Sequence, residues 1–155
     1  EEEILPYLDR LDEASAKRIF FTVKMQKLTE LAIDLLNRNI GYAEAEKILG
    51  VSVGVSDRLG WKKRKRILGE IMNMQHELLR DYYDVSTPEL EEIREAMLDA
   101  GAYGVKISGA GLGGALISLV DIKNAQQVLN AGLDAGAKRG WISPPAPGAS
   151  NHFVR

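Results

Sequence analysis

The sequence predicts an α+β fold in which an antiparallel pair of strands is covered by helices on one face. Two observations support this class. Apolar residues recur every three or four positions over several long segments, which is the spacing of amphipathic helices. Near residue 110, two short segments with the alternation of β-strands flank a loop rich in glycine. The second half of the chain therefore has the order helix, strand, loop, strand, helix and strand, which favours an α+β arrangement over a purely helical one.

Length and composition are those of one globular domain over residues 1–155. The chain is 45% hydrophobic and 27% charged, as is usual for a protein with its own core. Its 20 basic and 22 acidic residues leave no net field to attract nucleic acid or an anionic membrane. The absence of cysteine excludes disulfides and thiolate metal sites, and two distant histidines argue against a zinc site.

Targeting signals are also missing from the sequence. There is no apolar run of about 18 residues that could cross a membrane, and no signal-peptide pattern opens the chain. We therefore expect a cytoplasmic protein without a membrane or nucleic-acid partner. Because the sequence starts at Glu1 rather than at a methionine, we expect it to be a piece of a longer protein.

The first half of the chain is predicted to be helical. After a short acidic lead-in over residues 1–14, helices are predicted over residues 15–37 and 42–49. The first of these has apolar residues at helical spacing: Ile19, Phe20, Val23, Leu28, Leu31, Ala32, Leu35 and Leu36. Residues 50–56 are small or β-branched and are predicted to form a loop or a short extended piece.

A third helix is predicted over residues 65–80. Its apolar face consists of Ile67, Leu68, Ile71, Met72, Leu78 and Leu79. Asn73, His76 and Arg80 follow one another by three and four residues, so they share the opposite, polar stripe, which is normally exposed to water. The basic run at residues 61–66 is either a contact for phosphates or nucleic acid, or a solvated first turn of this helix. We favour the turn, because one short patch in an acidic chain is a poor nucleic-acid footprint.

The next helix has a clear start and end. Thr87 can cap it with Pro88 at the first helical position, or Ser86 can cap it with Glu89 closing a capping box. Gly101 ends it and leads the chain into the first strand.

The predicted strands cover residues 103–108 and 115–120, and the loop between them holds four glycines in six residues. A hairpin turn needs only one or two glycines, so the excess suggests unusual dihedral angles or the close approach of another group. One interpretation is an anion-binding site, because backbone amides without side chains, next to the hydroxyl of Ser108, can form a nest for an anion. The alternative interpretation is a structural one, either a flexible hairpin tip or a close crossing of two backbones. The pattern is neither a Walker A loop nor a dinucleotide fingerprint. We call these residues the glycine loop: Ser108, Gly109, Ala110, Gly111, Leu112, Gly113 and Gly114.

The C-terminal part is predicted to add one helix and one strand. Apolar residues between Ala125 and Leu133 make an amphipathic helix that Gly136 stops. Residues 139–143 are predicted to form a last strand, before a proline-rich tail that cannot be a central strand.

Residues 101–114 resemble the third signature motif of the GHMP kinases, which include galactokinases, homoserine kinases, mevalonate kinases and phosphomevalonate kinases. Residues 72–90 are similar to the segment before that motif in mevalonate kinases, and residues 79–86 to the same place in galactokinases. The resemblance covers roughly residues 15–143. It implies the C-terminal domain of a GHMP kinase, with a ferredoxin-like antiparallel sheet covered by helices.

The resemblance implies the substrate-side domain of an ATP-dependent kinase that phosphorylates a hydroxyl group, most similar to mevalonate kinase. A galactokinase-like sugar kinase and a non-catalytic regulatory or interaction module remain the alternatives. The intact enzyme would use ATP and Mg²⁺, with the glycine loop near the phosphates and with Asn73 and His76 as pocket residues beside a small-molecule substrate. No catalytic or metal-binding residue is assigned to this chain.

The family's phosphate-binding loop, of the type Pro-x-x-x-Gly-Leu-x-Ser-Ser-Ala, does not occur in this sequence. The resemblance therefore implies that an N-terminal, ATP-binding kinase domain is the missing partner of this chain. We expect the 155 residues alone to be inactive as a kinase. The sequence is also compatible with a homodimer.

Overall fold

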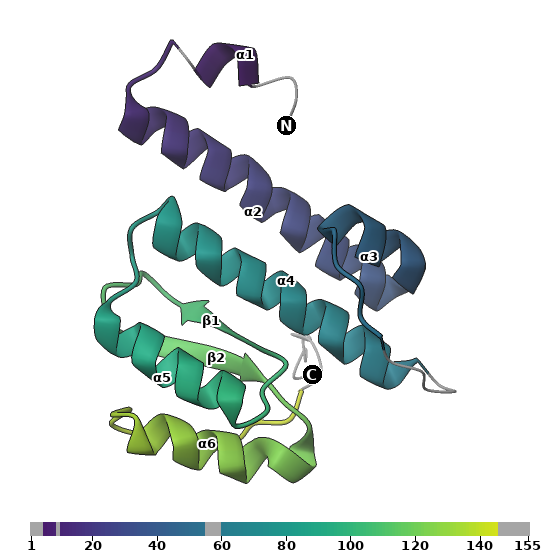
Figure 1. Ribbon diagram of the computed structural model, residues 1–155, viewed down its shortest axis with the longest axis vertical. Helices are drawn as coiled ribbons and strands as arrows, with labels where there is room; N and C mark the ends of the chain where they lie inside the picture. The colour runs from purple at the N-terminus through teal and green to yellow at the C-terminus, as the bar shows by residue number, and fades with distance from the viewer. Residues whose placement is uncertain (1–4, 9, 55–59, 146–155) are drawn as a thin grey trace, which may run out of the picture.

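The computed structural model describes residues 5–8, 10–54 and 60–145, and the fold is mostly helical with one small antiparallel sheet. In chain order (Figure 1) the elements are α1 (Leu5–Leu8), α2 (Glu13–Asn37), α3 (Tyr42–Leu49), α4 (Trp61–Asp81), α5 (Pro88–Asp99), β1 (Gly104–Ser108), β2 (Ala115–Leu119), the 3-10 turn η1 (Ile122–Asn124) and α6 (Ala125–Asp134). Among the described residues, no helix is both long enough and apolar enough to span a bilayer.

The predicted helices are confirmed, with starts or ends that differ by a few residues. The helix predicted over residues 65–80 begins earlier, so the basic run at residues 61–66 lies in the first turns of α4. At the start of α5, Thr87 is the cap: its side chain accepts a hydrogen bond from Leu90 N at 3.4 Å, and Pro88 takes the first helical position. Residues 50–54 are a loop, as predicted, while the rest of that segment lies outside the described residues.

The last predicted strand, residues 139–143, is wrong. The backbone there is irregular and pairs with neither β1 nor β2, and Trp141 and Ile142 are 76% and 42% exposed. Trp141 and Ile142 are residues that favour an extended backbone, but a strand also needs a neighbour to satisfy its N–H and C=O groups. The described part of the chain therefore has a two-stranded hairpin in place of the larger sheet of a ferredoxin-like fold.

The helix α4 lies between two groups of elements (Figure 1): α2 and α3 on one side, and the hairpin with α5 and α6 on the other. Figure 1 shows α2 and α4 side by side, running in opposite directions, with α3 against the end of this pair. The larger core lies where these three helices meet, and its buried members are Leu28, Leu31, Leu35, Ala45, Leu49, Val53, Ile67, Ile71 and Leu78. On its other side, α4 contacts β1, so this helix is enclosed from two directions.

The contact between α4 and β1 brings two backbones together. A Cβ atom on Gly69 would lie 2.3 Å from the carbonyl oxygen of Tyr103, and one on Gly104 would lie 2.3 Å from the carbonyl oxygen of Gly69. Glycine is therefore required on both sides. The carboxamide of Asn73 completes the contact, since its Oδ1 accepts from Val105 N at 3.1 Å and its Nδ2 donates to the oxygen of Tyr103 at 3.3 Å.

The two faces of the hairpin have different surroundings. The register pairs Val105 with Ser118 and Ile107 with Leu116, so these four side chains lie on one face. Ile107 packs there in a second core with Val85, Leu90, Leu79 and Leu116. Lys106, Ser108 and Ile117 belong to the opposite face.

We predict that Gly69→Ala lowers the free energy of unfolding by about 2–3 kcal/mol, because the new methyl group must push β1 away from α4. Gly54→Ala is the matched control: no atom of the described residues lies within 4 Å of its Cβ position, so we expect a change of at most about 0.5 kcal/mol. Urea unfolding of both variants measures the difference, and equal losses would contradict the close backbone contact.

Candidate functional site

The glycine loop joins β1 to β2 with an unusual backbone. Positive φ angles occur at Gly109 (105°), Gly111 (81°), Leu112 (56°), Gly113 (121°) and Gly114 (89°). Among the described residues, no atom lies within 4 Å of where a Cβ would stand on Gly109, Gly113 or Gly114. The backbone of the loop is therefore open to the approach of another molecule at these three positions, and exposed amides of this kind suit an anion.

Gly111 has a different role, because it packs against the protein. A Cβ on this residue would lie 2.4 Å from the Cβ of Val85 and 2.7 Å from its carbonyl oxygen. That same oxygen accepts a hydrogen bond from Leu112 N at 2.7 Å. Val85 is itself fixed by its own N–H, which donates to the carbonyl oxygen of Leu79 near the end of α4 at 3.1 Å. The centre of the loop thus rests on the segment between α4 and α5.

Beside the start of the loop, an open hollow of ≈ 560 Å³ lies between the hairpin and two helices. It is lined by Phe21 and Met25 of α2, by Met72 and Leu79 of α4, and by Lys106, Ile107, Ser108, Gly109 and Ile117. The walls are mainly apolar, and Lys106 and Ser108 are the polar side chains in the lining. Ser108 and Gly109 are the two predicted site residues that the hollow brings together.

Lys106 is the cation of this hollow. Its Nζ donates to Oε1 of Gln75 at 2.9 Å, and burial lowers the pKa of Lys106. Lys106 is not among the site residues predicted from the sequence, because a charged residue in an alternating strand normally faces water. The sequence feature that could have predicted a role for Lys106 in the site is its place in the strand that leads directly into the glycine loop.

The structure corrects the expectation that His76 lies on a solvated face. His76 is 0% exposed, and its Nε2 lies 2.7 Å from Oε1 of Glu91 on α5. Burial lowers the pKa of His76, although the hydrogen bond to Glu91 opposes this effect. Among the described residues, the buried Nδ1 of His76 has no hydrogen-bond partner. The polar stripe of α4 thus faces α5 and the hairpin at this position.

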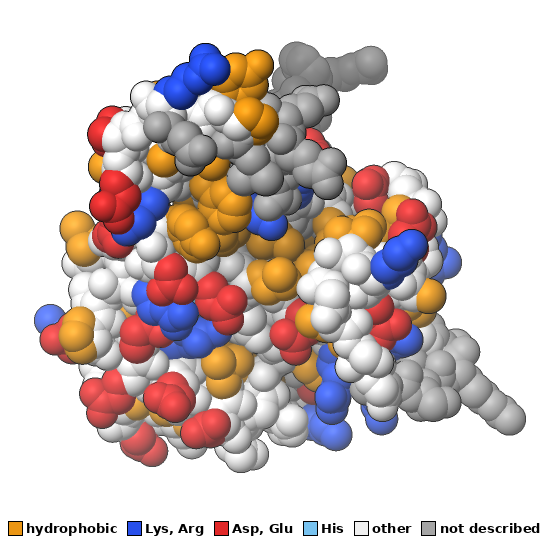
Figure 2. All heavy atoms as spheres, turned by 45° about the horizontal axis from the view of Figure 1, so that its top comes forward, with side chains coloured by type: hydrophobic (Ala, Val, Ile, Leu, Met, Phe, Trp, Pro, Cys, Tyr) orange, Lys and Arg blue, Asp and Glu red, His pale blue; other side chains and the backbone are white. Residues whose placement is uncertain are grey.

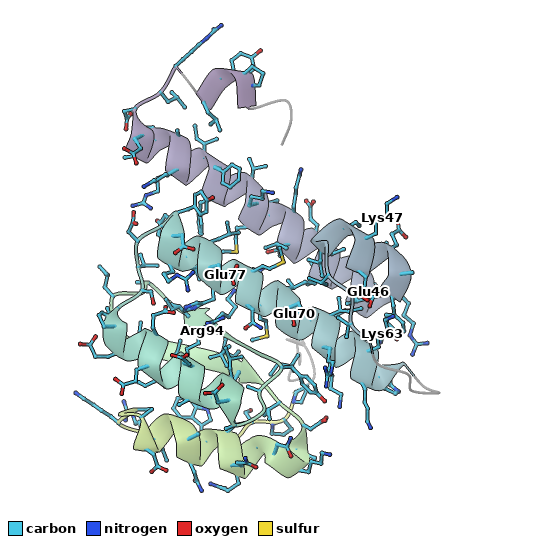
Figure 3. The ribbon with its side chains drawn as sticks, viewed as in Figure 1. Glu46, Lys47, Lys63, Glu70, Glu77 and Arg94 are labelled. Atoms are coloured by element: carbon cyan, nitrogen blue, oxygen red, sulfur yellow. The ribbon has the colours of Figure 1, made fainter. Side chains whose placement is uncertain are left out.

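Asn73 likewise binds protein groups. Besides its contacts with β1, its Oδ1 accepts from Nη2 of Arg94 at 3.3 Å, and Nε of Arg94 donates to the carbonyl oxygen of Val105 at 3.0 Å. Figure 3 labels Arg94, which extends from α5 towards the hairpin. The structure does not bring Asn73 or His76 into the lining of the hollow, and their assignment as pocket residues stays a prediction.

Two lysines of the basic run at the start of α4, Lys63 and Lys65, form ion pairs within the protein. Nζ of Lys63 lies 2.8 Å from Oε2 of Glu46, and Figure 3 shows this pair where α3 meets α4. Lys65 pairs with Asp121, which also accepts from the hydroxyl of Tyr103 at 2.6 Å. On the face drawn in Figure 2, acidic and basic side chains are intermingled. These contacts support a structural role for the run over a nucleic-acid surface.

Within the described residues, no group of three or more His, Cys, Asp or Glu side chains is arranged to hold a metal ion. The chemistry that the site offers is therefore hydrogen bonding from loop amides and the hydroxyl of Ser108, next to one lysine and an apolar wall.

Comparison with known proteins identifies a family and several relatives that this chain is similar to. Residues 62–138 match the model of the family described as GHMP kinases C terminal. The chain is 37% identical to a galactokinase of Canis lupus familiaris over 87 residues, which is 54% of this chain and 22% of that protein. It is 30% identical to a galactokinase of Homo sapiens over 124 residues, 78% of this chain and 31% of that protein. A galactokinase of Mycobacterium tuberculosis is 32% identical over 88 residues, 53% of this chain and 24% of the relative. The chain thus spans less than a third of the length of these relatives.

We predict that Gly111→Ala destabilises the protein more than Gly113→Ala. Both changes place a side chain at positive φ, which costs about 1–3 kcal/mol. Only the first also forces a methyl group into Val85, which adds about 1–3 kcal/mol. Thermal or urea unfolding of the two variants measures the order, and the reverse order would contradict the contact between the loop and Val85.

We also predict a pH dependence that originates at His76. Because burial lowers its pKa in the folded state, the unfolded chain binds a proton more readily, and stability falls as the pH drops below about 6.5. The loss reaches at most about 1.4 kcal/mol per pH unit. His76→Gln keeps an N–H donor for Glu91 but does not titrate. Urea unfolding between pH 8 and 5.5 should therefore show a steeper loss for the native protein, and parallel curves would contradict a buried neutral histidine.

Proposed function

This chain belongs to the GHMP kinase C-terminal family through residues 62–138, and from this membership we propose that it is the substrate-side part of an ATP-dependent sugar kinase of the galactokinase type. The relatives described above are named galactokinase. These names favour the sugar-kinase alternative of the sequence analysis over mevalonate kinase, which was its leading expectation. The single structural observation that carries the proposal is the open, positive-φ backbone of the glycine loop beside the hollow.

In this proposal the glycine loop contacts the phosphates of ATP. The residues fit such a group, because three of the loop positions are open to close approach and the hydroxyl of Ser108 is exposed at the start of the loop. ATP, bound with Mg²⁺, supplies the phosphoryl group. Phosphoryl transfer depends mainly on positioning and on donors aimed at developing charge, and backbone amides with a fixed geometry provide both. We assign no ligand of Mg²⁺ to this chain.

The remainder of the active site is proposed to come from an N-terminal kinase domain. The chain covers 22% and 31% of the lengths of the canine and human relatives, so most of such an enzyme lies outside it. The acceptor sugar would lie between the two domains, and the enzyme would act in the cytoplasm.

The experiment that tests this function uses the intact protein that contains this chain. We predict ATP-dependent phosphorylation of galactose at a rate at least about tenfold above that of mevalonate, phosphomevalonate or homoserine, since a site that hydrogen-bonds its substrate discriminates by this much or more. A preference for mevalonate would return the assignment to mevalonate kinase. Absence of turnover with all four would favour the non-catalytic module.

In the same intact protein we predict that Ser108→Ala lowers kcat by about 10- to 100-fold with little change in KM for galactose, as expected when a donor acts in the transition state. Ser52→Ala, in the exposed loop after α3, is the matched control and should leave both constants unchanged. A kcat that is equal in the two variants would remove Ser108 from the phosphate site.

A further inference from the structure

Glu91 is the shared partner in a network of hydrogen bonds and an ion pair next to the segment that supports the glycine loop. Its Oε1 accepts hydrogen bonds from the hydroxyl of Ser86 and from Nε2 of His76, and its Oε2 lies 3.5 Å from Nη1 of Arg80. Burial would raise the pKa of Glu91, but the hydrogen bonds from Ser86 and His76 lower it overall. The carboxylate is therefore ionised near neutral pH, and it acts only as an acceptor.

His76 is a fixed donor in this network. Because an ionised carboxylate cannot donate, the proton of the imidazole must lie on Nε2. The other nitrogen, Nδ1, is buried and has no partner in the part of the chain that the structure describes, so a second proton would bury an unsatisfied N–H group. His76 consequently holds one side of Glu91 in place from the interior of α4.

Ser86 connects the network to the loop. It directly follows Val85, whose carbonyl oxygen accepts from Leu112 N and whose side chain leaves room only for glycine at position 111. Ser86 lies outside the cap of α5, which Thr87 provides. The hydroxyl of Ser86 is therefore free to anchor the segment rather than to start the helix.

We infer that Glu91 is a positioning residue for the glycine loop: through Ser86 it fixes Val85, and Val85 fixes Leu112 and Gly111 in the shape that binds phosphate. The inference rests on the proposed function only for the last step, the use of that shape. A purely stabilising role for Glu91 would affect the whole domain, whereas a positioning role acts first on the loop.

The test is the hydrogen exchange of single backbone amides in this 155-residue chain, measured by NMR. Ser86→Ala should speed exchange of the Leu112 amide by roughly tenfold, the effect of about 1.4 kcal/mol at one hydrogen bond. The amide of Val128, in the buried face of α6, should keep its native rate. Ser86→Thr retains the hydroxyl and should restore slow exchange at Leu112, and Ser52→Ala should leave it unchanged.

A second pair of variants tests Glu91 itself. Glu91→Ala should speed exchange at Leu112 at least as much as Ser86→Ala, whereas Glu92→Ala, at the exposed neighbour, should not. Exchange at Leu112 that is unchanged in Ser86→Ala, or that rises equally at Val128, overturns the inference.

Binding of ATP to the intact protein is measured separately. If ATP does not bind to the native form, the proposed function fails, while the exchange data still decide whether Glu91 positions the loop. If ATP binds, its affinity should fall about tenfold in Ser86→Ala, and an unchanged affinity with faster exchange would overturn the link between loop shape and phosphate.

Discussion

The close contact of α4 with β1 is the constraint on which the rest of the structure depends. Helices usually pack on sheets through layers of side chains, but here Gly69 and Gly104 allow the two backbones to touch. The carboxamide of Asn73 offers β1 the donor and acceptor that a neighbouring strand would offer. A helix thereby completes the hydrogen bonding of a strand edge, and the contact aligns β1, its partner β2 and the loop between them relative to α4.

The same helix also supports the loop from its far end. The chain leaves α4 near Asp81 and passes through Val85, which carries the centre of the glycine loop, before it enters α5. Two points of support, one in the middle of α4 and one just after it, explain how so many residues with positive φ hold one conformation. Such backbone is costly by itself and persists where its surroundings determine it.

The sequence predicts those features that depend on local spacing and fails where distant partners decide. Helical periodicity, the cap at Thr87 and the glycine after α5 are local, and the structure confirms them. The strand expected at residues 139–143 fails, because residues that favour an extended backbone do not reveal whether a pairing strand is near. His76 fails for a related reason: an amphipathic pattern implies one face exposed to water, but α4 packs against α2 on one side and against β1 on the other, and His76 itself is buried and bonded to Glu91 of α5. The glycine pattern predicts two of the residues that line the hollow, Ser108 and Gly109. Nothing in the sequence around Glu91 predicts its role, because its partners Ser86 and His76 come together only in the fold.

The arrangement around the hairpin has a directional consequence. In the described part of the chain β1 has neighbours along both edges, α4 and β2, whereas β2 is paired along one edge alone. Any additional strand, from this or another polypeptide, can therefore join only beside β2. Growth of the sheet is asymmetric, and Asn73 and Arg94, together with Gly69 and Gly104, set its polarity.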